Sequence, residues 1–581
     1  MRMRKFFVLA VSMMLLFGIS GLAEAKKSAK KVQFIDVKPL SQVVDARVGE
    51  CGGKATQAFV ITWGGDIATI VAQGNQKSTA AGSIFAQQGL NLTLKREDDF
   101  TKQVSSYLKC ESPYLRGTLG MINMAADVTE KDSRTKMQTI YQHTWSAGGD
   151  AMVVKGGIKN AKNLKGKTIA LQAYGVHVDY LSRILSDAGL TMRDVKLRWT
   201  KDLTGTDNTP MKAFYEPDVD AAMVISPDAM ALTSGGKIGD GSEDSVKGAK
   251  ILLSTKTANR IIADVYAVRS DYFASHREEV AKFVHGLMLA DEATANLFKN
   301  KKAQPGQYNQ MISAAASILL DSPQATADAE GLYGDCEYVG WKGNVKFFGD
   351  KNYPRNFEHL NGEIQKSFTA LGIMRSKVVL SHAKWDYNSF KSGLHNTAGV
   401  DAPKFDAEKV AQLVTKKQKL GKFEEDEFLP SFEIYFKPNQ DDFSDSQYAD
   451  EFRHVIDRAS TYGGAVITIE GHADPLHYLK KKKQGASQVE LNQIKQGVKN
   501  LSLARANAVR ASIIRFAKSK GVALDVSQFV VVGQGISNPK SGLCGGDPCP
   551  PKTEQEWLSN MRVEFKMIQV EAETNVFEKI N

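Results

Sequence analysis

The chain has 581 residues, of which 42% are hydrophobic and 24% charged. This length allows several domains with substantial cores, and the composition excludes a disordered or fibrous protein. The net charge of +10 is modest, and its densest runs are Lys26–Lys31 and Lys480–Lys483. Peptidoglycan and anionic lipid head groups are the acidic partners that such runs suit; nucleic acid is compatible with the charge but is not a partner we expect.

The first 25 residues have the three parts of a secretory signal peptide. Arg2, Arg4 and Lys5 precede the apolar stretch Phe6–Ile19, and Ala23-Glu24-Ala25 gives a small-x-small cleavage pattern. The apolar stretch is short for a membrane span, and no other run of about eighteen apolar residues follows. No cysteine follows the cleavage site, which argues against a lipoprotein anchor. We therefore expect residues 1–25 to be removed and the mature protein to be soluble in a bacterial periplasm.

Residues 26–56 form a basic lead-in, and from Ala58 predicted strands alternate with helices. Phe59–Trp63 is a predicted buried strand ending at Gly64-Gly65-Asp66, and a helix follows to about Gln88. Further predicted strands are Leu90–Leu94, Met121–Ala125 and Thr139–Thr144. This alternation is typical of parallel α/β structure.

The region after residue 148 carries a more specific pattern. Strands are predicted at Gly149–Val154 and Asn163–Ala170, and the turn Gln172–Gly175 precedes an amphipathic helix at Val176–Ala188. Strands follow at Val219–Asp228 and Ile262–Arg269. Ser275 and Glu278 form a capping box that should begin the next helix.

These segments, with Leu164-Lys165-Gly166-Lys167-Thr168-Ile169-Ala170 at their centre, resemble the periplasmic solute-binding proteins of the nitrate, sulfonate and taurine ABC-transporter type. The resemblance spans about residues 57–394, with a second lobe at about 148–262. It implies a two-lobed α/β fold that closes over a small solute, and it makes an inner-membrane permease a possible partner.

The resemblance also implies a cleft between the lobes where strand ends and helix N-termini meet. Free backbone N–H groups and helix dipoles there would favour a solute with an anionic group. Asp66 and Asp150 could instead bind an ammonium group. The candidate solute-binding residues are Trp63, Gly65, Asp66, Asn123, Trp145, Ser146, Gln172, Tyr174, Thr206 and Ser226.

Residues 395–430 are the expected linker, with glycines, prolines and the acidic run Glu424–Glu427. One helix is predicted inside it, at Ala407–Lys417. A flexible linker of this length would let the two-lobed unit move while the rest of the chain is fixed.

Residues 431–572 contain a third pattern, and 573–581 form a tail. Ala465–Glu470 alternates as a strand and runs into Gly471-His472-Ala473-Asp474; a helix beginning near Asn500, with Ser502 as its cap, presents Arg505. Strands at Val530–Gly535 and Asn560–Phe565 complete a smaller α/β domain. The pattern resembles the OmpA-like peptidoglycan-binding domain.

That resemblance implies that Asp474 and Arg505 bind the ammonium and carboxylate groups of diaminopimelate in a cell-wall stem peptide. The alternative is an Asp–Arg ion pair inside the domain. The basic insertion 475–499 is longer than is usual in the family, and Met561 replaces a common arginine, which leaves Arg562 to help hold the pocket.

The five cysteines fit an oxidising compartment. Cys544 and Cys549 enclose a short Gly- and Pro-containing loop and should form a disulfide, whereas Cys51, Cys110 and Cys336 leave one thiol over if two pair. The cysteines and histidines show no zinc spacing, and we expect no metal or cofactor.

Three functions stay open at this point. The first is a solute receptor tethered to the cell wall, which could serve at the inner face of the outer membrane. The second is a wall-attached scaffold with a degenerate solute-binding module. The third is an enzyme on the same fold, as in thiamine-pyrimidine synthases, although no nucleophile elbow, P-loop or catalytic carboxylate pair is present and we expect no enzymatic activity.

Overall fold

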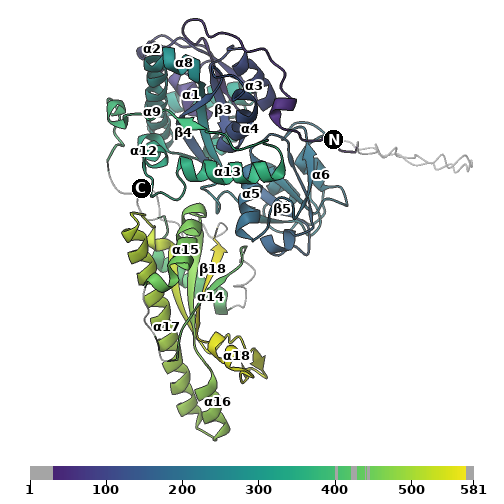
Figure 1. Cartoon of the computed structure of the whole chain (residues 1–581), viewed down its shortest axis with the longest axis vertical. Coiled ribbons are helices and arrows are strands. Elements are labelled where there is room, and N and C mark those ends of the chain that lie inside the picture. The colour runs from purple at the N-terminus through teal and green to yellow at the C-terminus, as the bar shows by residue number, and fades with distance from the viewer. Residues whose placement is uncertain (1–30, 399–403, 420–427, 439, 441–444, 571–581) are drawn as a thin grey trace, which may run out of the picture.

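The structure is a computed structural model that describes residues 31–398, 404–419, 428–438, 440 and 445–570. The predicted signal peptide, the acidic run Glu424–Glu427 and the tail lie outside the described residues. The described chain is mixed α/β, with a two-lobed unit and a smaller C-terminal unit adjoining it (Figure 1). Within the described ranges, no helix is both long and apolar enough to span a membrane.

The first lobe is built around a mixed sheet of order β11-β4-β10-β3. β4 (Met137–Ser146) and β10 (Ala263–Arg269) form its centre, flanked by β3 (Tyr114–Thr118), β11 (Cys336–Tyr338) and the short β12 (Ser381–His382). β1 (Gln57–Val60) and β2 (Thr93–Arg96) form a separate parallel pair. The helices are α1 (Asp66–Ala72), α2 (Ile84–Gln87), α3 (Phe100–Leu108), α4 (Leu119–Thr129), α8 (Ser270–Ser275), α9 (Arg277–Lys299), α10 (Pro305–Leu319), α11 (Thr326–Gly334), α12 (Gly340–Gly349) and α13 (Phe357–Leu371).

The second lobe has a five-stranded sheet of order β7-β6-β8-β5-β9. Its strands are β5 (Asp150–Val154), β6 (Thr168–Gln172), β7 (Lys196–Thr200), β8 (Ala221–Ile225) and β9 (Lys250–Ser254). Because β6 and β8 are parallel, their carboxyl ends lie at one edge, where α5 (His177–Asp187) and α7 (Ser226–Leu232) begin; α6 (Pro210–Phe214) leads into β8. β5 and α5 lie close to their predicted bounds. Only residues 168–170 of the strand predicted at Asn163–Ala170 belong to β6, and the strand predicted at Val219–Asp228 ends at Ile225, before α7.

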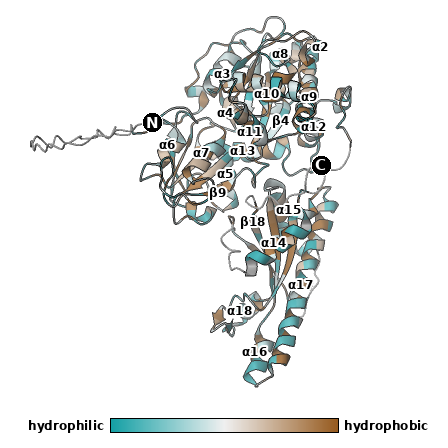
Figure 2. Cartoon of the chain, turned by 180° about the vertical axis from the view of Figure 1, so that it is seen from behind, coloured by the Kyte–Doolittle hydropathy of each residue, from teal (hydrophilic) through white to brown (hydrophobic). Residues whose placement is uncertain are grey.

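The C-terminal unit is a four-stranded sheet of order β13-β18-β14-β15. β14 (Ala465–His472) pairs in parallel with β15 (Phe529–Gly535) and antiparallel with β18 (Arg562–Gln569), which also pairs with β13 (Phe432–Tyr435). Its helices are α15 (Ala449–Thr461), α16 (Leu476–Lys483), α17 (Gln488–Ser519) and α18 (Glu554–Ser559). Figure 2 shows alternating hydrophilic and hydrophobic bands along α17, as expected for a helix with one face on a sheet.

Several sequence predictions of local structure were wrong. The single helix expected up to about Gln88 is two helices, α1 and α2, separated by residues 73–83. Met121–Ala125 is not a strand but part of α4, a helix buried on nearly every side, so that its apolar run has no helical period. Ser275 does not cap α9, because it is the last residue of α8 and its hydroxyl donates to the carbonyl of Asp271. Ser502 lies inside α17, which Ser487 caps.

The expected linker contains more structure than a flexible coil. Its predicted helix is present as α14 (Ala407–Lys419). Val410 and Val414 of α14 are buried in a cluster with Val466 and Val530 of the sheet. This part of the segment therefore packs against the C-terminal unit instead of spanning a gap.

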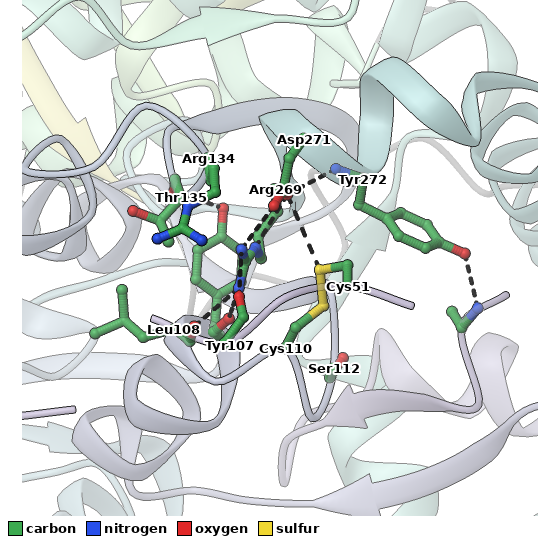
Figure 3. The surroundings of a disulfide bond; sticks show 12 residues. Cys51, Tyr107, Leu108, Cys110, Ser112, Arg134, Thr135, Arg269, Asp271 and Tyr272 are labelled. Carbon is green, nitrogen blue, oxygen red and sulfur yellow. Dashed lines mark hydrogen bonds and ion pairs between the residues drawn. A yellow bond between two sulfur atoms is a disulfide. The ribbon is translucent and has the colours of Figure 1, made fainter. Parts of the chain in front are cut away.

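Two disulfides are present among the described residues, and Cys336 is the cysteine left over. Cys544–Cys549 was predicted, and the structure confirms it. Cys51–Cys110 joins the lead-in to the residues after α3 (Figure 3). Beside it, the fully buried Arg269 donates to the carbonyls of Tyr107 and Leu108 at 3.1 and 2.8 Å.

The C-terminal unit is bound directly to the second lobe. Arg183 of α5 donates to Asp187 at 2.8 Å, to Glu363 of α13 at 2.6 Å and to Asp457 of α15. The Tyr462 hydroxyl donates to Asp187 at 2.6 Å. Further contacts run from Gln569 to the carbonyl of Leu252 and between backbone groups of Gly464 and Thr257. We call these residues the interunit contact.

Candidate functional site

The N-termini of two helices, one from each lobe, meet where the lobes touch. α4 of the first lobe is capped by Thr118, and α5 of the second begins at His177. A Cβ atom on Gly120 would lie 2.8 Å from Cγ of Asp179, so the Asp179 carboxylate lies against the backbone of α4. We call this region the lobe junction; its residues are Trp63, Gly120, Asp150, His177, Asp179 and Asp335.

Asp150 and His177 form a hydrogen-bonded pair in the lobe junction. Nε2 of His177 lies 2.8 Å from Oδ1 of Asp150, and the Ser146 hydroxyl donates to Oδ2 at 2.6 Å. The Thr255 hydroxyl accepts the Asp150 N–H at 3.1 Å. Ser146, a predicted ligand contact, therefore positions the Asp150 carboxylate.

Asp179 is 4% exposed, and neither of its carboxylate oxygens has a hydrogen-bond partner of good geometry. Burial raises the pKa of Asp179 to about 7, against the weaker opposing effect of the N–H groups of Asp179 and Tyr180 in the first turn of α5. The negative charges of Asp150 and Asp264 raise this pKa further. No group of the described residues therefore satisfies this carboxylate.

Beneath the lobe junction, Arg116 lies between two buried aspartates. Its guanidinium nitrogens are 3.1 Å from both oxygens of Asp66 and 3.0 Å from Asp264. Burial raises the pKa of Asp66, and it raises that of Asp264 to about 6. Asp66 was a predicted ligand contact, but this ion pair and its full burial give it a structural role.

Trp63 and Asp335 complete the lobe junction from the first lobe. The Trp63 ring lies so close to Gly149 that a Cβ atom there would be 2.5 Å from it, and its N–H donates to Thr144 at 2.9 Å. Oδ1 of Asp335 is 3.2 Å from the corresponding position at Gly148. Burial raises the pKa of Asp335 to about 6, Asp150 adds to this rise, and Lys256 opposes it.

The other predicted contacts are spread over the two-lobed unit. Gly65 is packed against His143 and Thr144, and Trp145 stacks edge-on against Phe347 in the core. Asn123 is not at a strand end but inside α4, where it donates to the carbonyl of Leu119 and accepts from Gln365. All three residues are buried, and their role in binding stays a prediction.

Four predicted contacts remain, all in the second lobe. The Tyr174 hydroxyl is bonded to the backbone of Lys38 in the lead-in, and the exposed Thr206 donates to Asp202. No contact among the described residues brings either side chain to the lobe junction. Gln172 ends β6, and Ser226 begins α7 with its hydroxyl on the carbonyl of Gly148; both stay candidates.

The C-terminal unit holds the second candidate site. Arg505 is almost fully buried and donates to the carbonyls of Gln440 (2.9 Å), His472 (3.1 Å) and Lys437 (3.4 Å). Asp474 is half-buried; its Oδ2 accepts the Leu476 N–H at 3.1 Å, and its Oδ1 has no partner. Burial raises the pKa of Asp474, while Leu476, Trp557 and Arg505 oppose the rise. We call Asp474 and Arg505 the C-terminal pocket.

Arg562 belongs to a buried charge network on the sheet. It lies 3.1 Å from both Glu433 and Glu564. Ligand atoms of Glu470, His472 and Glu564 lie within 4.8 Å of one another, a grouping that could hold a metal ion. Lys566 and Arg562 already pair with the two carboxylates, whereas both ring nitrogens of the buried His472 lack a hydrogen-bond partner.

The comparisons with known proteins concern the two-lobed unit. Residues 83–296 match the model of a family described as NMT1/THI5 like. The match covers a little over a third of the chain. A search of curated proteins found no match.

Similar solved structures cover a larger share at low identity. The alkanesulfonate-binding protein from Xanthomonas axonopodis pv. citri, solved with MOPS, is 14% identical over 57% of this chain and 98% of its own, with a TM-score of 0.38. The periplasmic nitrate-binding protein from Synechocystis PCC 6803 is 12% identical over 61% and 87%, with a TM-score of 0.37. A desulfurization enzyme gives 14% identity over 58% and 98%, with a TM-score of 0.35. At these identities and TM-scores, the similarity does not identify a ligand of this chain.

Proposed function

We propose that this chain is an exported solute receptor, held non-covalently at the peptidoglycan, that captures a small molecule at the lobe junction. The observation that carries the proposal is the buried, unpartnered carboxylate of Asp179 between the two lobes. A buried polar group without a partner costs roughly 1–3 kcal/mol, and a ligand would supply the missing bonds. The NMT1/THI5-like match over the same residues supports this proposal.

Tethering is the second half of the proposal. A strand ending in Gly-His-x-Asp, with Arg505 on the helix beside it, supports an OmpA-like unit that binds diaminopimelate. Asp474 can accept from the ligand ammonium, and Arg505 offers the positive charge for its carboxylate. The proposed location is the periplasm, at the cell wall, and the partner that would receive the solute is an ABC-transporter permease.

The sequence favoured an anionic solute, because helix N-termini meet at the cleft. The side chains of the lobe junction are mostly carboxylates, which disfavour an anion. The proposed function therefore does not depend on a sulfonate or nitrate ligand.

The alternative is a wall-attached scaffold in which the lobes no longer open, and enzymatic activity is the weakest candidate. Native mass spectrometry of the chain purified from exporting cells separates these readings. A receptor should carry a stoichiometric small-molecule adduct. A scaffold should carry none, and its small-angle scattering curve should be unchanged by any periplasmic extract.

A further inference from the structure

Three buried atoms at the lobe junction lack a hydrogen-bond partner. They are Oδ1 and Oδ2 of Asp179 and Nδ1 of His177. Both side chains are more than nine-tenths buried, so water does not replace the missing partners freely. The three atoms lie on the first turn of one helix, at residues separated by a single position. They form one incomplete recognition surface.

When Asp179 is ionised, all three atoms are acceptors. Carboxylate oxygens only accept hydrogen bonds. Because Nε2 of His177 faces a carboxylate oxygen of Asp150 at 2.8 Å, Nε2 carries the proton, and in the neutral ring Nδ1 is then a lone-pair acceptor. A sulfonate or nitrate group would bring more acceptors to these positions. A protonated amine or a guanidinium group brings only donors.

The charges around the three atoms have the same preference. Asp150, Asp179 and Asp335 are carboxyl groups, and the negative charge of Asp150 raises the pKa of both Asp179 and Asp335. Arg116 is already shared by Asp66 and Asp264, and the exposed Lys256 is the cation beside Asp335. A positive ligand would therefore relieve repulsion between carboxylates that are held together without enough countercharge.

An aromatic ring adds to this preference. Trp63 lies against Gly149, next to Asp150, and is only partly buried. The face of a Trp ring attracts an organic cation, and it offers nothing to nitrate or phosphate. Acceptors, carboxylates and an aromatic ring together are the usual components of a site for an alkylammonium group.

From these contacts we infer that the lobe junction binds a small organic cation with N–H donors, an amine or guanidine, through Asp179 with His177, Asp150 and Trp63 beside it. The inference rests on the proposed receptor function and specifies its solute class. It replaces the oxyanion expected from the resemblance with a ligand of opposite charge.

The test uses the mature full chain and probes that match in size but differ in charge. The cations are 1,5-diaminopentane and agmatine; the anions are glutarate, methanesulfonate and nitrate; Mg²⁺ tests for a metal ion. Binding is measured by titration calorimetry, and native mass spectrometry identifies any molecule that copurifies. The variant is Asp179→Asn, which keeps the side-chain shape. The control is Asp218→Asn, an exposed aspartate of the same lobe that pairs with Arg198 on the surface.

A cationic probe or cationic copurified molecule should bind wild type and Asp218→Asn equally and bind Asp179→Asn at least 30-fold more weakly. An anion that binds, with Asp179→Asn unchanged or tighter, would overturn the cation inference and leave the receptor function standing. Mg²⁺ binding that Asp179→Asn removes would also overturn it, in favour of a metal site. No adduct from cells and no binding by any probe would overturn the receptor function as well.

Discussion

The carboxylate of Asp179 in the second lobe lies directly against the backbone of Gly120 in the first, with only 2.8 Å between its Cγ and the place a Cβ of residue 120 would take. The two lobes thus meet through a charged group and a residue without a side chain. A methyl group at position 120 would occupy the space of the carboxylate.

Gly120→Ala should therefore weaken solute binding about 10-fold or more without unfolding the protein. Alanine favours the helix by about 1 kcal/mol relative to glycine, so α4 itself gains stability. Titration with the solute that copurifies, or with the best probe, measures the effect. Gly331→Ala is the matched control, because Gly331 is also helical and has open space around it. Equal affinities in both variants would show that Asp179 does not face the ligand.

Asp179→Asn should change how the stability of the ligand-free protein depends on pH. The pKa of about 7 in the folded state lies above the ordinary value of 3.8, so the folded protein binds this proton more tightly than the unfolded chain. Stability from this group is present below pH 4 and is lost as the pH rises through 7.

The free-energy gain of Asp179→Asn over wild type should consequently be about 2–3 kcal/mol larger at pH 8 than at pH 5. Denaturant unfolding at the two pH values measures this difference. Asp150 and Asp264, which raise the same pKa, remain in the variant. A gain that is equal at both pH values would place Asp179 in contact with solvent.

Asp474→Asn and Arg505→Lys should each weaken binding of the full chain to purified peptidoglycan about 30-fold in a sedimentation assay. Asp474→Asn leaves the ligand ammonium without its counter-charge, and Arg505→Lys keeps the charge but loses the bidentate guanidinium contact. These mild changes suit the C-terminal pocket, since Arg505 also holds three backbone carbonyls and its removal would lower stability. Asp450→Asn and Arg453→Lys alter an exposed Asp–Arg pair of the same unit and serve as controls. Normal sedimentation of both pocket variants would end the tether proposal.

The two disulfides should contribute unequally to stability. Loop closure predicts about 4 kcal/mol for Cys51–Cys110, which spans 59 residues, and about 2 kcal/mol for Cys544–Cys549, which spans five. Paired Cys→Ala variants compared by denaturant unfolding should show this order. The reverse order would mean that native-state contacts, such as Tyr478 and Lys482 with Asp547 in the smaller loop, dominate over chain entropy.

Arg183→Ala should loosen the C-terminal unit from the second lobe. Arg183 is nearly buried, and its loss leaves Asp187 and Asp457 without their cation, a change that typically costs about 3–5 kcal/mol. Small-angle scattering should show a larger maximum dimension for this variant. Arg198→Ala, which removes an exposed ion pair of the same lobe, should leave the curve unchanged. Identical curves for the two variants would mean that the interunit contact depends on its backbone bonds.

Much of the fold was predictable where one physical signal dominated. α5 has a clear apolar face and was found at nearly its observed bounds, and β8 is a continuous apolar run whose predicted range extended into α7. α4 was missed because Met121, Ile122, Asn123 and Met124 are all buried, which removes the period that separates helix from strand. The cap at Thr118 was the available signal.

The candidate site was less predictable, because its main residue looks ordinary in the sequence. An aspartate in the first turn of a helix usually stabilises the helix dipole. Only the position of Gly120 across the lobe junction shows that Asp179 is buried and faces the other lobe. Asp66 and Asp150 were both considered as contacts for an ammonium group. In the structure Arg116 forms an ion pair with Asp66, whereas Asp150 contacts His177.

The interunit contact has a consequence for how such a receptor would move. The second lobe contacts the C-terminal unit through Arg183, Asp187, Leu252 and Thr257. If that unit is anchored, the second lobe is stationary with it. The first lobe is tied to the same region, because Glu363 of α13 pairs with Arg183 and Glu337 of β11 pairs with Lys404. Opening would therefore have to separate these two ion pairs, while Asp179 stays in place on the second lobe.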